Sequence, residues 1–308
     1  MEVRSRAKAK IACGVVFGTV AIVGCSSAMS SGGGDGAGEG AAAAPETSAA
    51  PTSVAPTTTV PPTSTLAPTT TVEPSTTTST TTTTTLPPSV VAVPVVDPPL
   101  AAIGSSSGGE ASRIQQRLVD LGFWISGVDG SYGLTTHQAV MAFQKYIGLD
   151  TTGSVDPQTA EAMTNMELRP HARANSGTLV EIDKGTQLLF FVIDGRTEYI
   201  LNTSTGNGES YTEDDQNTPG ETISGVSLTP NGLHEVNRQR EEGWWEGDLG
   251  EIYRPKYFVG GVAVHGSNSI PNYPASHGCV RVSVPAMDWI WDAGIFPINT
   301  PVWVHEGA

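Results

Sequence analysis

Residues 257–281 read Tyr-Phe-Val-Gly-Gly-Val-Ala-Val-His-Gly-Ser-Asn-Ser-Ile-Pro-Asn-Tyr-Pro-Ala-Ser-His-Gly-Cys-Val-Arg, and this stretch decides the fold of the second half of the chain. Its first eight residues are mostly apolar, aromatic or β-branched, which predicts a buried strand over 257–264. The strand ends at His265, and a loop rich in proline and glycine leads on to Cys279. A strand end is rigid, so it can hold an imidazole in a fixed direction.

Cys279 is the only cysteine after residue 25, so it has no intramolecular disulfide partner in the folded region. A lone thiol with histidines nearby is typical of a nucleophile. A cysteine with an ordinary pKa of about 8.5 is mostly protonated near neutral pH and needs a base, for which His265 is the candidate. A buried structural thiol is one alternative, and the glycine and histidines around Cys279 disfavour it.

A zinc site made by His265, His277 and Cys279 is a second alternative. No acidic or further cysteine ligand stands at the usual spacing, which disfavours it. We therefore expect no metal and no cofactor.

The sequence around this stretch predicts a mainly β domain over residues 176–308. Asp194-Gly195 is a strong two-residue hairpin turn. Ser283 is placed to cap one short helix over 284–293. Period-two alternation and apolar runs predict the remaining strands, over 178–183, 187–193, 197–201, 232–236 and 301–305.

A smaller helical domain is predicted over residues 108–168. Apolar residues recur at helical spacing over 112–121, and two further helices begin near Thr135 and Pro157. Thr135 with Gln138 forms a capping-box pattern, and Asp156 is the expected N-cap of the third helix. Two glycine-containing loops, 129–133 and 152–156, resemble each other and precede the second and third helices.

The small domain resembles the three-helix peptidoglycan-binding domain of bacterial wall enzymes. The resemblance covers most of its 60 or so residues. It implies non-catalytic binding to peptidoglycan, with stem peptides as partners. The matching segments are 114–118, 121–123, 127–133, 136–140, 143–145 and 148–149.

The β domain resembles the catalytic domain of L,D-transpeptidases in four ordered blocks, at residues 202–206, 229–236, 257–266 and 276–281. The last block, Ser-His-Gly-Cys-Val-Arg, is the signature of the family. The segment between His265 and Ser276 is shorter than in the better-known members, which leaves the shape of the active-site flap open.

The resemblance assigns roles to the residues of the signature. Cys279 is implied as the nucleophile and His265 as the base, with Gly266 orienting the imidazole. The amides near Gly278 and Cys279 are expected to form the oxyanion hole. The remaining expectations are that Ser276 and His277 shape the turn and that Arg281 and Tyr257 bind substrate. For Arg281, a structural salt bridge is an equal alternative.

The implied reaction is an acyl transfer through a cysteine thioester that forms 3-3 cross-links between peptidoglycan stems. Carbapenem-type β-lactams are expected to acylate Cys279. A carboxypeptidase that uses water as the acceptor remains an alternative, as does a wall-binding anchor with a vestigial catalytic domain. A Cys/His endopeptidase is disfavoured because it would place the cysteine before the histidine.

The N-terminal region predicts export and anchoring. Residues 1–25 have a basic start and an apolar run too short for a membrane span. The run ends in Ile-Val-Gly-Cys, which resembles a lipobox and implies lipidation of Cys25 at the outer face of the cytoplasmic membrane; an ordinary cleaved signal is the alternative. Residues 26–104, rich in Thr, Pro and Ala, are expected to be a disordered linker that lets the enzyme reach into the wall.

The chain is acidic, with a formal net charge of −15. This argues against nucleic acid as a partner and against simple electrostatic adhesion to anionic surfaces, so an anionic substrate must meet local cations. Trp244 and Trp245 either form a wall of the substrate cleft or anchor a long loop.

Overall fold

The structure, a computed structural model, describes residues 90–307. The predicted signal, the lipidation site at Cys25 and most of the predicted linker lie outside the described residues. Within the described part of the chain, no helix combines the length and the apolar character needed to cross a membrane.

The prediction of a disordered linker is wrong for residues 90–104. This segment runs along the helical domain, where the amide of Val93 donates to the carbonyl of Glu167 (2.8 Å) and that of Val96 to the carbonyl of Thr164 (3.0 Å). Leu100 is buried in the core of that domain. The average composition of the tract conceals these few apolar residues at its end, which bury enough surface to order the segment.

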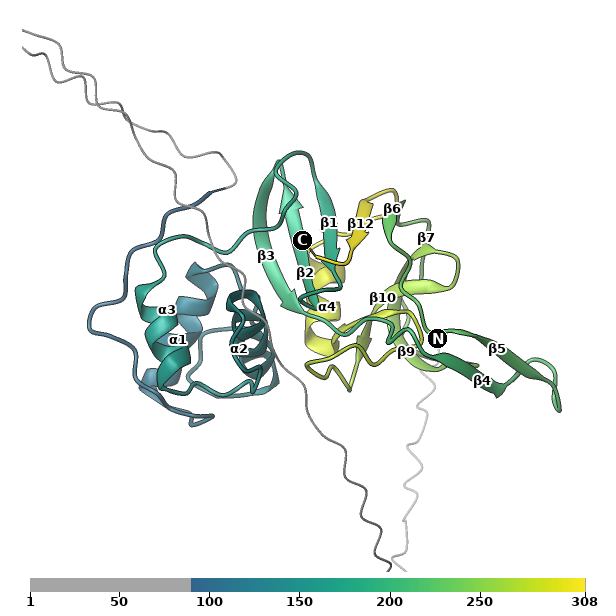
Figure 1. The fold of residues 1–308 in the computed structure, drawn as a ribbon, viewed down its shortest axis with the longest axis horizontal. Coiled ribbons are helices and arrows are strands. Elements are labelled where there is room, and N and C mark those ends of the chain that lie inside the picture. Colours follow the sequence, from purple (N-terminus) through teal and green to yellow (C-terminus); the bar gives the residue numbers. More distant parts are fainter. Residues whose placement is uncertain (1–89, 308) are drawn as a thin grey trace, which may run out of the picture. The chain divides into compact units, whose positions relative to one another are not determined.

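Three helices form the first part of the described chain, α1 (Gly109–Asp120), α2 (Leu134–Ile147) and α3 (Pro157–Asn165) (Figure 1). Asp156 caps α3 as expected, since its carboxylate accepts from the amide of Thr159. The prediction of a capping box at the start of α2 is wrong. The N-cap is Gly133 rather than Thr135, and glycine has no side chain that could cap the helix. The Gln138 side chain instead accepts a hydrogen bond from the Asn202 amide group (2.6 Å).

Two buried glutamines explain why the two loops resemble each other. Gln115 of α1 accepts from the amides of Asp129 and Gly130, at 3.0 and 2.7 Å. Gln144 of α2 accepts from the amide of Gly153 (2.8 Å) and donates to the carbonyl of Ser154 (2.9 Å). Each loop therefore folds around the amide group of a glutamine from the preceding helix.

The second part of the chain is built from two five-stranded sheets, a hairpin and one helix (Figure 1). The first sheet has the order β3-β2-β1-β12-β6, with β1 Leu179–Asp183, β2 Leu188–Ile193, β3 Arg196–Asn202, β6 Gly232–Glu235 and β12 Pro301–His305. The second has the order β11-β10-β9-β7, and β8 also pairs with β9. Its strands are β7 Arg238–Gln239, β8 Trp244–Gly247, β9 Gly250–Val259, β10 Val262–Ser267 and β11 Val280–Ser283.

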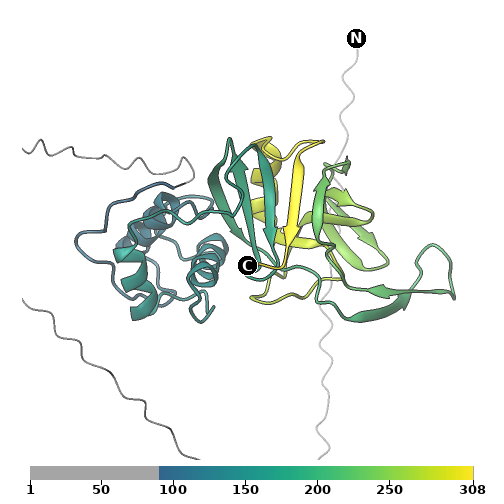
Figure 2. The ribbon, with the colours of Figure 1, turned by 45° about the horizontal axis from the view of Figure 1, so that its top comes forward.

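The remaining elements are the hairpin of β4 (Ser210–Asp214) and β5 (Thr222–Val226), and the helix α4 (Val284–Asp292). The hairpin projects away from the sheets, as Figure 2 shows. Ser283 caps α4 as expected and accepts from the amide of Ala286.

The two sheets and α4 share one hydrophobic core. Phe191 and Val302 of the first sheet, Val264 of the second and Met287 of α4 belong to one buried cluster. Because α4 packs on the Val264 side of the second sheet, the opposite side of that sheet is left for other contacts.

The helical domain packs directly on β2 and β3 of the first sheet. Ile200 of β3 exchanges backbone hydrogen bonds with the segment after α1, donating to Gly122 (2.8 Å) and accepting from Trp124 (3.0 Å). Phe190 and Ile200 are buried in the same cluster as Phe143 of α2. The two predicted domains therefore share apolar surface, which the sequence alone did not indicate.

We expect Gln115→Leu to lower the free energy of unfolding by about 1–3 kcal/mol, because the buried amide of Gly130 and the partly buried amide of Asp129 lose their acceptor. Gln116→Leu is the matched control: the Gln116 side chain bonds only Asp120 at the surface, so its change should stay within about 0.5 kcal/mol. Urea unfolding of both variants measures the difference. Equal losses would contradict the role assigned to Gln115.

Candidate active site

The register of the second sheet brings the sequence-predicted site residues to one face. In the parallel pair of β10 and β11, Val264 lies opposite Val280, and His265 opposite Arg281. Side chains alternate between faces along a strand, and the valines point into the core beside α4. His265 and Arg281 therefore point to the opposite face, as does Cys279, two residues before Arg281.

These side chains line a cavity of about 410 Å³. Tyr257, Ser276 and His277 line it as well, so the structure brings together all the predicted side chains of the site. Further walls come from the β4–β5 hairpin and from β8 with the turn that follows it; their lining residues include Tyr211, Ile223, Val226, Trp245, Asp248 and Leu249. Trp245 thus forms part of the cleft wall, whereas Trp244 packs against Tyr253 at 5.2 Å between ring centroids.

The two hairpins touch each other beside this cavity. The backbone amide of Gln216, in the β4–β5 turn, donates to Asp248 Oδ1 (2.9 Å), and its side-chain amide donates to the carbonyl of Gly247 (3.1 Å). The cavity is therefore bordered by two connected hairpins.

His265 is buried, with 3% of its surface exposed, and its Nδ1 lies 2.8 Å from the carbonyl oxygen of Gly266. A carbonyl only accepts, so Nδ1 carries the proton and Nε2 is left with a free lone pair. Burial lowers the pKa of His265 to about 4, and the positive charge of Arg281 acts in the same direction. The imidazole is therefore neutral near pH 7 and can accept a proton at Nε2.

Cys279 is half-buried, and burial raises the pKa of its thiol above the ordinary value. A hydrogen bond from the Ala263 backbone and the charge of Arg281 act in the opposite direction without reversing the shift. The resting site thus holds a neutral thiol and a neutral imidazole rather than a thiolate–imidazolium pair.

The turn before Cys279 is held by Ser276. Its hydroxyl donates to the carbonyl of Cys279 (2.5 Å) and accepts from the amide of Gly278 (3.1 Å). Gly278 has a φ of +134°, and a Cβ there would lie 2.8 Å from the carbonyl oxygen of Leu228, so glycine is required. The Gly278 amide, expected as an oxyanion donor, is already occupied by Ser276.

Arg281 lies in the cavity without a carboxylate partner. Within residues 90–307, no Asp or Glu oxygen lies within 4 Å of its guanidinium, so the alternative of a structural salt bridge is not realised. The His277 ring contacts the β4–β5 hairpin, with Tyr211 at 5.3 Å between centroids and Glu213 Oε1 at 4.0 Å from Nε2.

Comparison with known proteins decides the family. Residues 177–304 match the L,D-transpeptidase catalytic domain, and residues 107–163 match a putative peptidoglycan-binding domain. The crystal structure of an L,D-transpeptidase from Xylanimonas cellulosilytica is 48% identical, with a TM-score of 0.59. The match covers 68% of this chain and 99% of that one.

The chain belongs to the L,D-transpeptidase family. The predicted fold class, a helical peptidoglycan-binding domain followed by a mainly β catalytic domain, is confirmed.

Two curated amidases share a shorter segment with this transpeptidase. An N-acetylmuramoyl-L-alanine amidase of Mycobacterium tuberculosis is 39% identical over 70 residues, and a probable one of Bacillus licheniformis is 36% identical over 75 residues. The matches cover 21% and 24% of this chain. The transpeptidase spans only 17% and 21% of their lengths, so the likeness is to one segment of each amidase.

The buried segment 203–205, for which the sequence indicated no role, holds the loop that leads to Cys279 in place. The Thr203 hydroxyl donates to the carbonyl of Arg281 (2.7 Å), and the backbone of Ser204 exchanges hydrogen bonds with that of Arg281. The carbonyl of Thr205 accepts from the amides of Ala275 and Ser276, each at 3.0 Å. The run of small hydroxyl residues in 202–206 was the available signal.

The sequence indicated no role for Thr229 either. Its buried hydroxyl accepts from the amide of Gly206 (2.9 Å) and donates to the carbonyl of Gly278 (2.6 Å). It therefore links the segment beside Thr205 to the residue that precedes Cys279.

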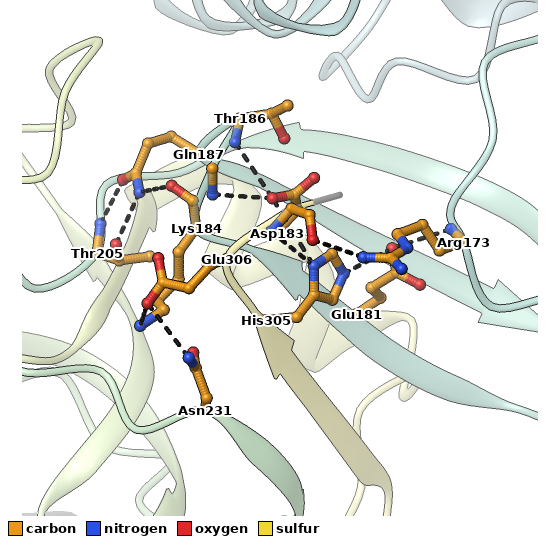
Figure 3. A network of polar contacts seen from close by, with 12 residues as sticks. Arg173, Glu181, Asp183, Lys184, Thr186, Gln187, Thr205, Asn231, His305 and Glu306 are labelled. Carbon is orange, nitrogen blue, oxygen red and sulfur yellow. Dashed lines mark hydrogen bonds and ion pairs between the residues drawn. The ribbon is translucent and has the colours of Figure 1, made fainter.

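A polar network around Gln187 supports segment 203–205 (Figure 3). The side-chain amide of Gln187 donates to the Thr205 hydroxyl and accepts from the Thr205 amide, each at 2.8 Å. Asp183 holds the turn before Gln187 by accepting from the amides of Gly185 and Thr186. His305, for which the sequence indicated no partner, lies 3.2 Å from the buried carboxylate of Glu181.

We expect alkylation of Cys279 by iodoacetamide to rise with pH and to have a midpoint above about 8.5, the pKa of an unperturbed cysteine. The physical reason is that burial keeps the thiol protonated near neutral pH. Mass spectrometry of the modified peptide measures the rate, with Cys279→Ala as the background. A midpoint below pH 7 would indicate a resting thiolate–imidazolium pair and contradict the neutral pair described above.

Proposed function

We propose that this transpeptidase forms 3-3 cross-links through a thioester on Cys279. The observation that carries the proposal is that Cys279 and the unprotonated Nε2 of His265 share one cavity on one face of a sheet. In the first step His265 Nε2 takes the thiol proton while sulfur attacks the carbonyl between diaminopimelate and the terminal D-Ala of a donor stem. D-Ala leaves with the proton from His265, and the acyl group stays on sulfur.

In the second step the side-chain amine of a neighbouring stem attacks the thioester. His265 accepts a proton from the attacking amine and returns it to the departing sulfur, which restores the thiol. No cofactor or metal takes part in this sequence. The Cys279 thiol and the His265 imidazole are both neutral at rest. The positive charge on His265 and the negative charge on the substrate oxygen therefore develop together as the bond between sulfur and the carbonyl carbon forms.

Donors for the developing oxyanion have to come from the turn around Cys279. The Gly278 amide is occupied by Ser276, so we assign this role to the amides of Cys279 and His277. Removing one such donor from an acyl-transfer site typically costs about 3–4 kcal/mol in transition-state stabilisation. Ser276 and Gly278 then act by shaping the turn, and the carbonyl of Gly266 acts by orienting the imidazole.

Arg281 and Tyr257 are proposed to bind the donor stem. The guanidinium of Arg281 has no carboxylate partner among the described residues, so it is free to pair with a stem carboxylate. Tyr257 lines the same cavity, with one face of its ring covered by Arg238 at 3.9 Å.

The rim of the cavity favours an amine over water as the acceptor. Asp248 and Glu251 line it, and Glu213 lies beside His277. These carboxylates attract a protonated amine toward the cavity, where it must lose a proton before it attacks. Water gains nothing from this charge, so we place transpeptidation ahead of carboxypeptidation.

Cys279→Ala should abolish cross-linking of a disaccharide-tetrapeptide, because no thioester can form. His265→Gln should slow it by about 10²–10⁴, the usual contribution of a general base. Mass spectrometry of the products, with and without an acceptor amine, measures both effects. Wild-type enzyme should release D-Ala and form the dimer; D-Ala release with no dimer would identify a carboxypeptidase.

The same variants test acylation by a carbapenem. The wild type should gain the mass of the drug, and Cys279→Ala should not.

A chelator tests whether the reaction needs a metal. Loss of wild-type turnover on adding the chelator would contradict the metal-free reaction.

We further propose that the enzyme is held at the outer face of the cytoplasmic membrane by lipid on Cys25. The support is the basic start, the short apolar run and the small residues around Cys25. The Thr- and Pro-rich tract that follows would let the catalytic part reach into the wall. Peptidoglycan bound by the helical domain would then keep it there.

Cys25→Ala should move the protein from the membrane fraction to the soluble fraction, because the acceptor of the lipid is lost. Immunoblots of fractionated cells measure the shift, and Cys279→Ala is the control that should stay in the membrane fraction. A Cys25→Ala protein that remains with the membranes would contradict the anchor.

A further inference from the structure

A second cavity, of about 680 Å³, lies between the helical domain and α4. We call it the rear cleft. Its walls are the segment after α1, the side chain of Arg169, two residues of β3 and one side of α4, and the lining residues used below are Trp124, Arg169, Glu198, Tyr199, Asp288, Trp289 and Asp292. None of these residues lines the catalytic cavity. Because α4 covers the core side of the second sheet, the rear cleft and Cys279 belong to opposite faces of that sheet.

Aromatic rings form the body of the rear cleft. The ring centroids of Trp124 and Trp289 lie 5.3 Å apart, and those of Tyr199 and Trp289 lie 4.7 Å apart. All three side chains are partly exposed. Trp124 comes from the helical domain and the other two from the β domain, so a ligand here would touch both. The rings are inclined to one another by 36° and 69°, so they do not form one flat surface. Partly exposed aromatic rings bind the apolar faces of ligands that also carry polar groups.

Polar groups surround the rings. Glu198, Asp288 and Asp292 supply carboxylates, and Asp292 is exposed. Asp288 is already engaged through one oxygen by Tyr253 and Arg254, which leaves its other oxygen available. The rim therefore offers mainly hydrogen-bond acceptors.

Arg169 is the cation of the cleft. It bonds the carbonyl of Glu198 through Nη2, while its buried Nε has no partner among residues 90–307. A Cβ on Gly122 would lie 2.4 Å from that Nε, so glycine is what allows the guanidinium to lie against the backbone of the helical domain. That Nε is enclosed by the protein, so a ligand cannot reach it. Nη1 makes no hydrogen bond among the described residues and is not buried, so it is the donor of Arg169 that a ligand in the rear cleft can reach.

We propose that the rear cleft binds a saccharide segment of the glycan strand of peptidoglycan. A pyranose ring offers an apolar C–H face to the indoles, hydroxyl donors to the carboxylates, and an acetamide carbonyl to Arg169. Glu198 pairs with Arg196 (3.6 Å) and Asp288 with Arg254 (2.8 Å), whereas Asp292 pairs with no cation among residues 90–307. Asp292 would repel an anionic group bound beside it, and a purely apolar ligand would bury its carboxylate without a partner. The volume lies in the range of small-molecule sites.

This inference rests on the proposed function only in taking peptidoglycan as the substrate. It means that the glycan is held jointly by both domains, on the side of the sheet away from the thiol. Binding of the glycan strand and acylation of Cys279 can then occur at the same time on one molecule. It also assigns glycan contact to a surface that the helical domain does not possess by itself.

The test is calorimetric titration of the Cys279→Ala protein with chitotetraose, a peptide-free oligomer of N-acetylglucosamine. We expect binding that weakens at least tenfold in both Trp124→Leu and Asp292→Ala. Asp292 is an exposed rim residue, so its variant should fold even if the Trp124 variant does not. Trp244→Leu is the matched control, because Trp244 is exposed and lies outside the rear cleft; it should bind as the parent protein does.

Two further measurements separate this proposal from the catalytic one. Wild-type enzyme whose Cys279 carries a carbapenem should still bind chitotetraose with the parent affinity. Loss of binding after acylation would overturn the proposal, because it would place the sugar in the catalytic cavity. Unchanged affinity in Asp292→Ala together with Trp124→Leu would also overturn it, as would binding of a free tetrapeptide stem but not of chitotetraose. If cross-linking fails while these affinities hold, only the proposed reaction is wrong.

Discussion

The parallel pairing of β10 with β11 is the constraint on which the site depends. It places His265 beside Arg281 and aims both, with Cys279, away from α4. Parallel neighbours cannot be joined by a tight turn, so the chain has to cross over through the long loop 268–279. That loop carries the thiol at its end, and its position must be fixed by contacts from elsewhere.

Those contacts come from segment 203–205 and from the helical domain. Thr205 accepts from Ala275 and Ser276, and the Ser204 hydroxyl donates to the carbonyl of Tyr273. From the helical side, the side chain of Asn272 donates to the carbonyl of Thr151 (2.9 Å). The loop that leads to Cys279 is thus fixed on both sides, which holds its short, glycine-containing turn in one position.

Much of the catalytic face could be predicted from the sequence, and the reason is local. The apolar character of residues 257–264, the lone Cys279 and His265 each carry their own signal. The single strand predicted over 257–264 is nevertheless wrong, because Gly260 (φ +53°) turns the chain, so that β9 ends at Val259 and β10 begins at Val262 and runs past His265. The role of the Gly278 amide could not be predicted, because it depends on where the Ser276 hydroxyl points. The linking role of Thr229 could not be predicted either, since its two hydrogen-bond partners lie 23 and 49 residues away in the chain.

The secondary structure shows the same division between local signals, which the sequence reveals, and long-range contacts, which it does not. Strands with clear alternation and the caps at Asp156 and Ser283 follow from nearest-neighbour chemistry, and they were found. The short β7 and the exposed strands β4 and β8 bury too little to leave a pattern. The apolar outer face of β2 and β3 could not be assigned to a partner, because only the three-dimensional packing shows that helices cover it.

The packing of the helices on β2 and β3 also decides what a shortened chain would expose to water. A fragment cut after α3 would uncover Phe190, Val192 and Ile200, which the helices otherwise shield from water. Their apolar side chains would line one outer strand and its neighbour, a surface that invites aggregation. The helical domain therefore serves the β domain as a cover for the outer face of β2 and β3, and removing it would leave that face open to water.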